Sequence, residues 1–199
     1  MSEKTVAQAE LQRQKNYAEM VHTVLSARIS GEPKAFVHTY GSQGNVADSE
    51  RIKGMLSEMG YTFTESEDEA DLILFNTCAI IEHAEDRVIG NVGALKSKKI
   101  RNPGCVIALC GCMMQQSHVA DRIKNSYRFV DLVFGTHVVH KLPEMLYKVL
   151  CTGSRVFELP QSDGVIAEGL PVSSDSSFKA WLPIMYGCNN FCCYCIVHY

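Results

Sequence analysis

The sequence predicts an α/β fold, a doubly wound and mostly parallel sheet with helices on both faces, followed by a separate C-terminal segment. Short apolar runs such as AFVHTY and DLILFN are typical of buried strands. These runs alternate with longer stretches of helical periodicity between residue 34 and about residue 150. Strands that alternate with helices form right-handed crossovers and a parallel sheet covered on both faces. The length of 199 residues suits one well-packed domain and is short for two.

The expected elements follow in order along the chain. An amphipathic helix is expected from Thr5 to about Ser26, where apolar residues approximate helical spacing, and the turn-forming GEP at residues 31–33 ends it. Apolar, β-branched runs predict the strands, at residues 35–40, 61–64, 71–76, 105–110 and 130–135. Apolar residues three or four positions apart predict the remaining helices, at residues 46–59, 82–99, 119–125 and 141–150.

The composition changes beyond Cys151. QSDGVIAEGLPVSSDSS is rich in Gly, Ser and Asp and contains Pro, which is typical of a linker, and FKAWLPIMYG then reads as the first strand of a new unit. A lone strand leaves its backbone groups unpaired, so we expect a truncated domain at the C-terminus. The predicted parts are a helical extension, an α/β domain, a linker and the start of a second domain, at residues 1–33, 34–152, 153–178 and 179–199.

The charge balance gives no general reason to bind a polyanion. The chain has 19 basic and 22 acidic residues, a net charge of -3, so any contact with nucleic acid must be local or lie elsewhere. The N-terminus is polar and lacks the apolar region of a signal peptide, and no apolar run is long enough to span a bilayer. A cytoplasmic location without a membrane partner is therefore expected.

Nine cysteines are an odd and high number for this length, so they cannot all form disulfides. Cys188, Cys192 and Cys195 follow the pattern C-x3-C-x2-C, which wraps three soft thiolates around one inorganic centre. Such ligands select zinc, copper(I) or an iron–sulfur cluster. Zinc usually takes four ligands in two separated pairs, and no second pair stands at suitable spacing in the same segment. On a four-iron cluster, three thiolates leave one iron open for reaction, with Cys193 as an alternative fourth ligand.

The loop CNNFCCYCIV resembles the cluster motif of the radical S-adenosylmethionine methylthiotransferases. Residues 34–138 are similar to the N-terminal domain of that family, through HTYGSQGNVADSERIKGMLSEMGY, DEADLILFNTCAIIEHAEDRV and ALCGCMMQQ. The resemblance implies that Cys188, Cys192 and Cys195 hold a 4Fe–4S cluster whose open iron binds S-adenosylmethionine and generates a 5′-deoxyadenosyl radical. FKAWLPIMYG would then open a radical barrel.

The resemblance also implies an auxiliary 4Fe–4S cluster on the α/β domain. Cys78 and Cys112 match two of its three ligands, at the ends of the third and fourth expected strands. The family reads G-C-Q-x-N after the first strand, where this chain has Ser42 within GSQGN. A serine at the third ligand position predicts a cluster that binds poorly or incompletely, with Cys110 as the nearby substitute.

Gln43 and Asn45 favour the tRNA-modifying branch over the ribosomal-protein branch, which shows G-C-P-K-N. The resemblance is to MiaB-type enzymes and implies conversion of N6-isopentenyladenosine beside the anticodon into its 2-methylthio derivative. The implied partners are the tRNA and an electron donor. The family continues into the barrel and an RNA-binding domain, so the 199-residue chain alone is expected to be inactive.

Two kinds of alternative remain open at this point. One is a non-enzymatic iron–sulfur or zinc-binding module, which acid-labile sulfide analysis would distinguish because zinc sites contain no sulfide. The other is a radical methylthiotransferase with a different substrate, either a ribosomal protein or threonylcarbamoyladenosine in tRNA.

Overall fold

A six-stranded sheet forms the centre of the computed structural model, which describes residues 5–79, 84–160, 166–174, 176, 178–184 and 192–193. All neighbouring strands are parallel, in the order β2-β1-β3-β4-β5-β6. The strands are β1 (Lys34–Thr39), β2 (Thr62–Phe63), β3 (Leu72–Thr77), β4 (Val106–Gly111), β5 (Leu132–Phe134) and β6 (Val156–Glu158). The predicted α/β class with a parallel sheet is confirmed.

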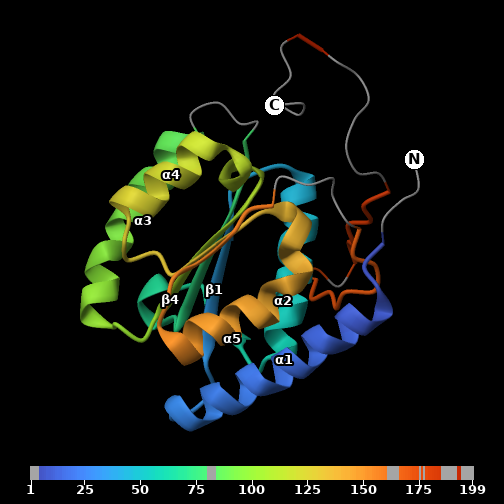
Figure 1. Cartoon of the computed structure of the whole chain (residues 1–199), viewed down its shortest axis with the longest axis horizontal. Helices are drawn as coiled ribbons and strands as arrows, with labels where there is room; N and C mark the ends of the chain where they lie inside the picture. Colours follow the sequence, from blue (N-terminus) through green and yellow to red (C-terminus); the bar gives the residue numbers. More distant parts are fainter. Residues whose placement is uncertain are drawn as a thin grey trace.

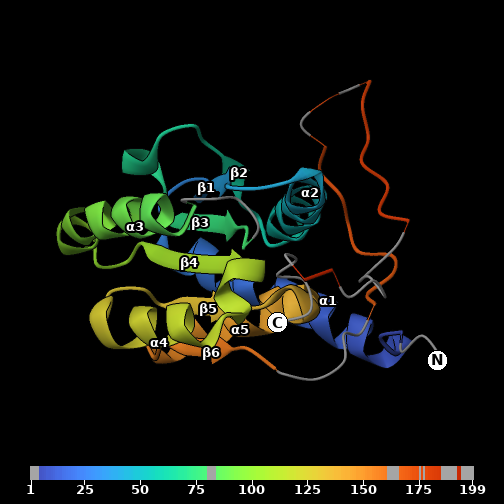
Figure 2. The same ribbon diagram turned by 90° about the horizontal axis from the view of Figure 1, so that it is seen from above.

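Helices cover both faces of the sheet, with α3 and α4 on one side and α1, α2 and α5 on the other (Figures 1 and 2). The helices are α1 (Gln8–Arg28), α2 (Gln43–Glu58), α3 (Ala84–Arg101), α4 (Ser117–Ser126) and α5 (Leu142–Thr152). Three short 3-10 helices are η1 (Glu67–Glu69), η2 (Cys112–Gln115) and η3 (Thr136–Lys141). Within the described residues, no helix combines the length and apolar character needed to cross a membrane.

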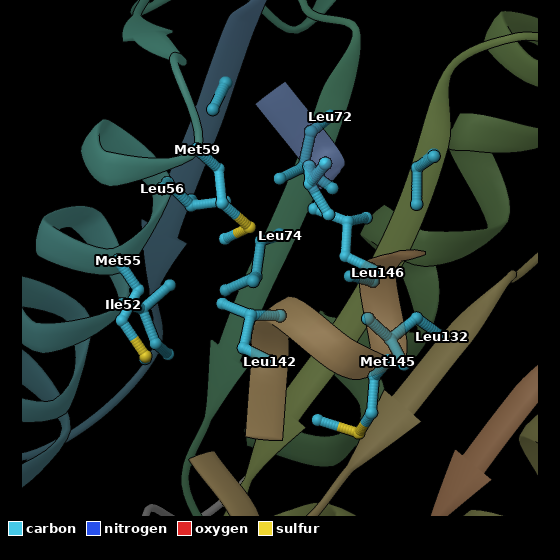
Figure 3. Close-up of a cluster of buried hydrophobic side chains, with 14 of the residues drawn as sticks. Ile52, Met55, Leu56, Met59, Leu72, Leu74, Leu132, Leu142, Met145 and Leu146 are labelled. Atoms are coloured by element: carbon cyan, nitrogen blue, oxygen red, sulfur yellow. The ribbon is translucent and has the colours of Figure 1, made fainter. Parts of the chain in front are cut away.

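The central strands β3 and β4 are buried along their whole length because both of their faces are covered. Side chains alternate between the faces, so Leu72 and Leu74 pack toward α2 and α5 while Ile73 and Phe75 pack toward α3 and α4. Figure 3 shows the first of these two cores, where Ile52 and its neighbours on α2 lie on the same face of the sheet as Leu142 and Leu146 of α5. Two separate apolar cores therefore hold the sheet in place.

The structure differs from the sequence prediction at the C-terminal edge of the sheet. β6 pairs with β5 within the residues that the sequence assigned to the linker, so the sheet extends beyond the expected boundary at residue 152. A three-residue strand is too short to show a period of its own, and its pairing depends on β5. The strand expected over 178–187 is absent from its described part, residues 178–184.

A polar junction joins α1 to α5. Arg13, Gln14 and Lys148 donate hydrogen bonds to the Glu144 carboxylate, at 3.0, 3.2 and 2.8 Å. The side-chain oxygen of Gln14 in turn accepts the Glu144 backbone N–H at 3.2 Å. Gln14 and Glu144 are both buried, so this exchange replaces the water that each side chain loses.

We expect Glu144→Ala to lower the free energy of unfolding by about 1–3 kcal/mol, because it removes one of the two carboxylates that accept from the buried Gln14 amide, together with the acceptor of Arg13 and Lys148. Urea denaturation at pH 7 measures the change, and Glu19→Ala, an exposed carboxylate on α1, is the control. Burial alone would raise the pKa of Glu144, but the hydrogen bonds from Lys148 and Gln14 lower it below the ordinary 4.5. The stabilisation is therefore present above about pH 4.5 and lost as the pH falls through the lower pKa of the folded protein. Equal stability of the two variants would contradict the prediction.

Candidate functional site

Ser42, Cys78 and Cys112 lie at the carboxyl ends of three adjacent strands. β3 is the neighbour of both β1 and β4, and Cys78 follows it directly. A Cβ atom placed on Gly41 would lie 2.9 Å from the Cβ of Cys78, so the chain after β1 passes close to this cysteine. The carboxyl edge of a parallel sheet is the usual place for a binding site in such folds. The structure thus gathers the three residues that the sequence singled out.

The thiols of Cys78 and Cys112 form a pair. Cys112 is hydrogen-bonded to Cys78, accepts the Ala79 backbone N–H at 3.0 Å and donates to the Thr77 carbonyl at 3.6 Å. Burial, followed by the influence of Cys78, raises the pKa of the Cys112 thiol, while the Ala79 N–H acts against this shift. Cys112 is therefore a protonated thiol at neutral pH, and a metal that binds it must displace the proton.

Ser42 ends the loop after β1 as the N-cap of α2. Its backbone N–H and its hydroxyl both donate to the Asn45 side-chain oxygen, each at 3.2 Å, and the two residues form a capping box. The helix begins at Gln43, three residues before the start predicted from the sequence, because a serine cap followed by Gln-Gly gives no apolar signal. The Ser42 hydroxyl thus donates a hydrogen bond within the helix cap, and its proton is already hydrogen-bonded to the Asn45 side-chain oxygen.

A buried amide network lies beneath the two cysteines. Asn45 donates to the Thr77 carbonyl at 3.2 Å and to the Asn76 side-chain oxygen at 3.3 Å. Asn76, which is 1% exposed, donates to the Asn45 carbonyl at 2.8 Å and to the Ser49 hydroxyl at 3.0 Å. These bonds tie the end of β3 to the first turns of α2. The sequence singled out Asn45 but did not indicate that it binds Asn76.

Gly111 allows the close approach of β4 to the end of β3. Its φ is +100°, and a Cβ atom there would lie 2.1 Å from the Thr77 carbonyl oxygen. Cys110, one residue earlier, points into the apolar core on the α2 and α5 side, where burial raises the pKa of its thiol well above the ordinary range. Cys110 is therefore a packing residue in this structure and does not line the site.

The residues present fit two of the three ligand positions of a four-iron cluster. Cys78 and Cys112 supply soft sulfur donors, while Ser42 supplies a hydroxyl. Among the described residues, no group of three His, Cys, Asp or Glu side chains could hold a metal ion. The combination of two thiols and one hydroxyl accounts for this result at the sheet edge.

The second predicted cluster site falls mostly outside the described residues. Cys188 and Cys195 belong to the parts of the chain that the structure does not describe, and Cys192 and Cys193 are exposed and free. The ligand set Cys188, Cys192 and Cys195 thus stays a prediction from the sequence.

Comparisons with known proteins place the fold and site in context. Residues 34–135 match the family described as "Uncharacterized protein family UPF0004". The chain is 52% identical over 163 residues to the tRNA-2-methylthio-N(6)-dimethylallyladenosine synthase of Clostridium perfringens (strain SM101), a match that covers 82% of this chain and 36% of the relative. The proteins of the same name from Clostridium botulinum (strain Eklund 17B) and Thermoanaerobacter sp. (strain X514) are 48% and 50% identical, over 85% and 82% of this chain and 37% and 35% of their own lengths. The chain therefore spans little more than a third of the length of these curated relatives.

Proposed function

The chain belongs to the uncharacterized protein family UPF0004, and on that premise we propose that it serves in a tRNA methylthiotransferase that acts on N6-isopentenyladenosine, also called dimethylallyladenosine. The observation that carries the proposal is the pair of thiols, Cys78 and Cys112, at the carboxyl edge of the sheet. The relatives of about 50% identity bear the name of this activity and support the same substrate.

In this proposal Cys78 and Cys112 hold the auxiliary 4Fe–4S cluster, and Cys188, Cys192 and Cys195 hold the cluster that binds S-adenosylmethionine. When bound, these groups supply the sulfur, the methyl group and the radical. The α/β domain provides the surroundings of the first pair of ligands. Once a metal displaces the Cys112 proton, the Ala79 N–H would stabilise the sulfur as a thiolate, and the 1% exposure of Cys78 keeps water from its sulfur.

The network of Asn45 and Asn76 has a positioning role in the proposal. It fixes the loop after β1 against the loop after β3, and so sets the distance between residue 42 and Cys78. Ser42 makes the third ligand position weak, because its hydroxyl is a poor soft-metal ligand and already caps α2. We therefore expect a site that binds its cluster incompletely.

A chimeric enzyme tests the proposal. Residues 1–199 of this chain replace the aligned part of the Clostridium perfringens synthase, in a host that lacks 2-methylthio nucleosides, and mass spectrometry of digested tRNA measures the product. We expect the Ser42→Cys chimera to form at least about tenfold more product than the unchanged chimera, since even the supporting partners of metal ligands contribute about 10–100-fold.

Two variants of the Ser42→Cys chimera give the control and the contradicting outcome. Cys78→Ala should abolish the product, whereas Cys151→Ala should leave it unchanged because Cys151 is exposed at the end of α5. Full activity in Cys78→Ala would contradict the role of the sheet edge. Purified chain that contains zinc and no acid-labile sulfide would favour the zinc-binding module instead.

A further inference from the structure

Residues 166–174, which we call the strap, run beside α2 although their composition is that of a linker (Figures 1 and 2). The strap is attached at both of its ends. At the first end, Ile166 pairs with Thr5 as a parallel bridge and accepts the Val6 backbone N–H at 3.0 Å. At the second end, the Ser173 N–H donates to the Glu50 carbonyl at 2.9 Å. The strap is therefore a docked segment.

Gly54 of α2 provides the space that the strap occupies. A Cβ atom at this position would lie 2.3 Å from the Pro171 carbonyl oxygen, 2.4 Å from the Pro171 carbonyl carbon and 2.7 Å from the Val172 nitrogen. All three are backbone atoms, which cannot move aside without moving the strap itself. Glycine is unfavourable inside a helix, so its presence here matches the close approach of a second backbone.

Glu50 binds the strap through its side chain as well. Its carboxylate accepts the Ser174 hydroxyl at 2.9 Å, and the carboxylate is buried, with the residue only 4% exposed. The same hydroxyl also lies 3.2 Å from the Lys179 carbonyl, which it can approach as a donor. Leu170 packs against the apolar core between α2 and α5. Backbone, side-chain and apolar contacts thus converge on one face of α2.

We propose that the strap anchors the connection between the sheet domain and the cysteine loop at residues 188–195, and that Gly54 and Glu50 are its positioning residues. The helix that receives the strap is the helix that Ser42 caps. The chain that leads to the proposed cluster site at residues 188–195 is thereby attached to α2, whose N-terminus borders the proposed cluster site at Cys78 and Cys112. The docking itself stands on the contacts above, and only its consequence for catalysis rests on the proposed function.

The number of residues between the last docked residue and Cys188 gives the size of the expected effect. From Ser174 to Cys188 the chain is 14 residues long, whereas from Glu158 at the end of β6 it is 30 residues long. The effective concentration of a tethered group falls roughly as the −3/2 power of tether length. Release of the strap should therefore lower the effective concentration of the cysteine loop at the sheet edge by about threefold.

Hydrogen–deuterium exchange of the 199-residue chain tests the docking. In Gly54→Ala the peptide that covers the strap should exchange at least about tenfold faster, while α2 itself stays protected because alanine favours a helix. Gly90→Ala is the matched control, since it lies on α3 with nothing within 4 Å of the added Cβ. Ser174→Ala, which leaves the core untouched, should accelerate exchange at Ser173 on the order of fivefold, the effect of one hydrogen bond.

Equal strap exchange in Gly54→Ala and Gly90→Ala, or an unprotected strap in the unchanged chain, would overturn the docking. The consequence is tested in the Ser42→Cys chimera, where Gly54→Ala should lower product about threefold without changing iron or sulfide per chain. Unchanged product with a released strap would overturn the positioning role. Inactivity of every chimera would count against the proposed function, while a protected strap in the same proteins would still support the docking.

Discussion

Ser42→Cys is expected to raise the iron and acid-labile sulfide held at the sheet edge from a partial content toward about four of each per chain. The measurement is anaerobic reconstitution of the 199-residue chain, followed by chemical analysis of both elements. Cys188, Cys192 and Cys195 are replaced by alanine in every protein compared, so that only the site at Cys78 and Cys112 contributes.

The expected size follows from the acidity of the ligand. A cysteine thiol has a pKa of about 8.5, and the pKa of an aliphatic hydroxyl lies far above it, near that of water. The difference in pKa corresponds to on the order of 10 kcal/mol, at about 1.36 kcal/mol per unit, before the metal acts. Iron recovers part of this difference because a cation stabilises either anion, but oxygen remains the harder ligand.

The structure adds a second cost for serine as a ligand. The Ser42 hydroxyl donates its proton to Asn45, so a bond to iron would remove a hydrogen bond of the helix cap as well as the proton. Cysteine is a poorer cap than serine, and the chain without metal should lose about 0.5–2 kcal/mol of stability in Ser42→Cys. Cluster content should therefore rise while the stability of the metal-free protein falls.

Ser42→Ala separates the two effects, because it removes the cap hydroxyl without adding a thiol. Its stability should resemble that of Ser42→Cys, and its cluster content should not exceed that of the unchanged chain. Full and equal cluster content in the unchanged chain and in Ser42→Cys would show that the hydroxyl ligates adequately. Loss of residual cluster in Cys110→Ala would show that Cys110 leaves the core to substitute.

Most of the fold could be predicted from the sequence because the central strands and their helices carry clear apolar patterns. β3 and β4 are continuous apolar runs, and their helices have clear apolar periodicity, so their positions are correct to within a few residues. β6 escaped prediction because three residues carry too little pattern, and their pairing depends on a strand more than twenty residues away. The strap escaped for a similar reason, since Gly54 marks a close backbone approach only once its partner Pro171 is known.

The candidate site could be predicted as a location but not as a geometry. Cys78 and Cys112 follow apolar runs, and parallel strands bring their carboxyl ends together, so their proximity was foreseeable. The sequence could not show that the Ser42 proton binds Asn45, because a cap is recognised from the start of the helix and α2 begins with polar residues and glycine. Nor could it separate Cys110 from Cys112, since the conformation of Gly111 decides which thiol faces the site.

The backbone conformation of Gly111 also predicts a large loss of stability in Gly111→Ala. With φ of +100° and ψ of -179°, Gly111 lies in a backbone region that is essentially restricted to glycine, where another residue costs of order 1–3 kcal/mol. The added Cβ would also meet the Thr77 carbonyl oxygen at 2.1 Å and the Thr77 nitrogen at 2.6 Å, both within the central strand pair. Strain and overlap together predict a loss of about 3–5 kcal/mol in the free energy of unfolding.

Urea denaturation measures this loss, and Gly104→Ala is the control, because Gly104 is exposed and the nearest atom to its added Cβ is 3.4 Å away. Relief of the overlap requires β4 to move away from the end of β3, which separates Cys112 from Cys78. In the Ser42→Cys background, cluster content should therefore fall in Gly111→Ala and stay unchanged in Gly104→Ala. A Gly111→Ala protein within about 1 kcal/mol of the unchanged chain, with full cluster content, would show that the Thr77 backbone yields without disturbing the thiol pair.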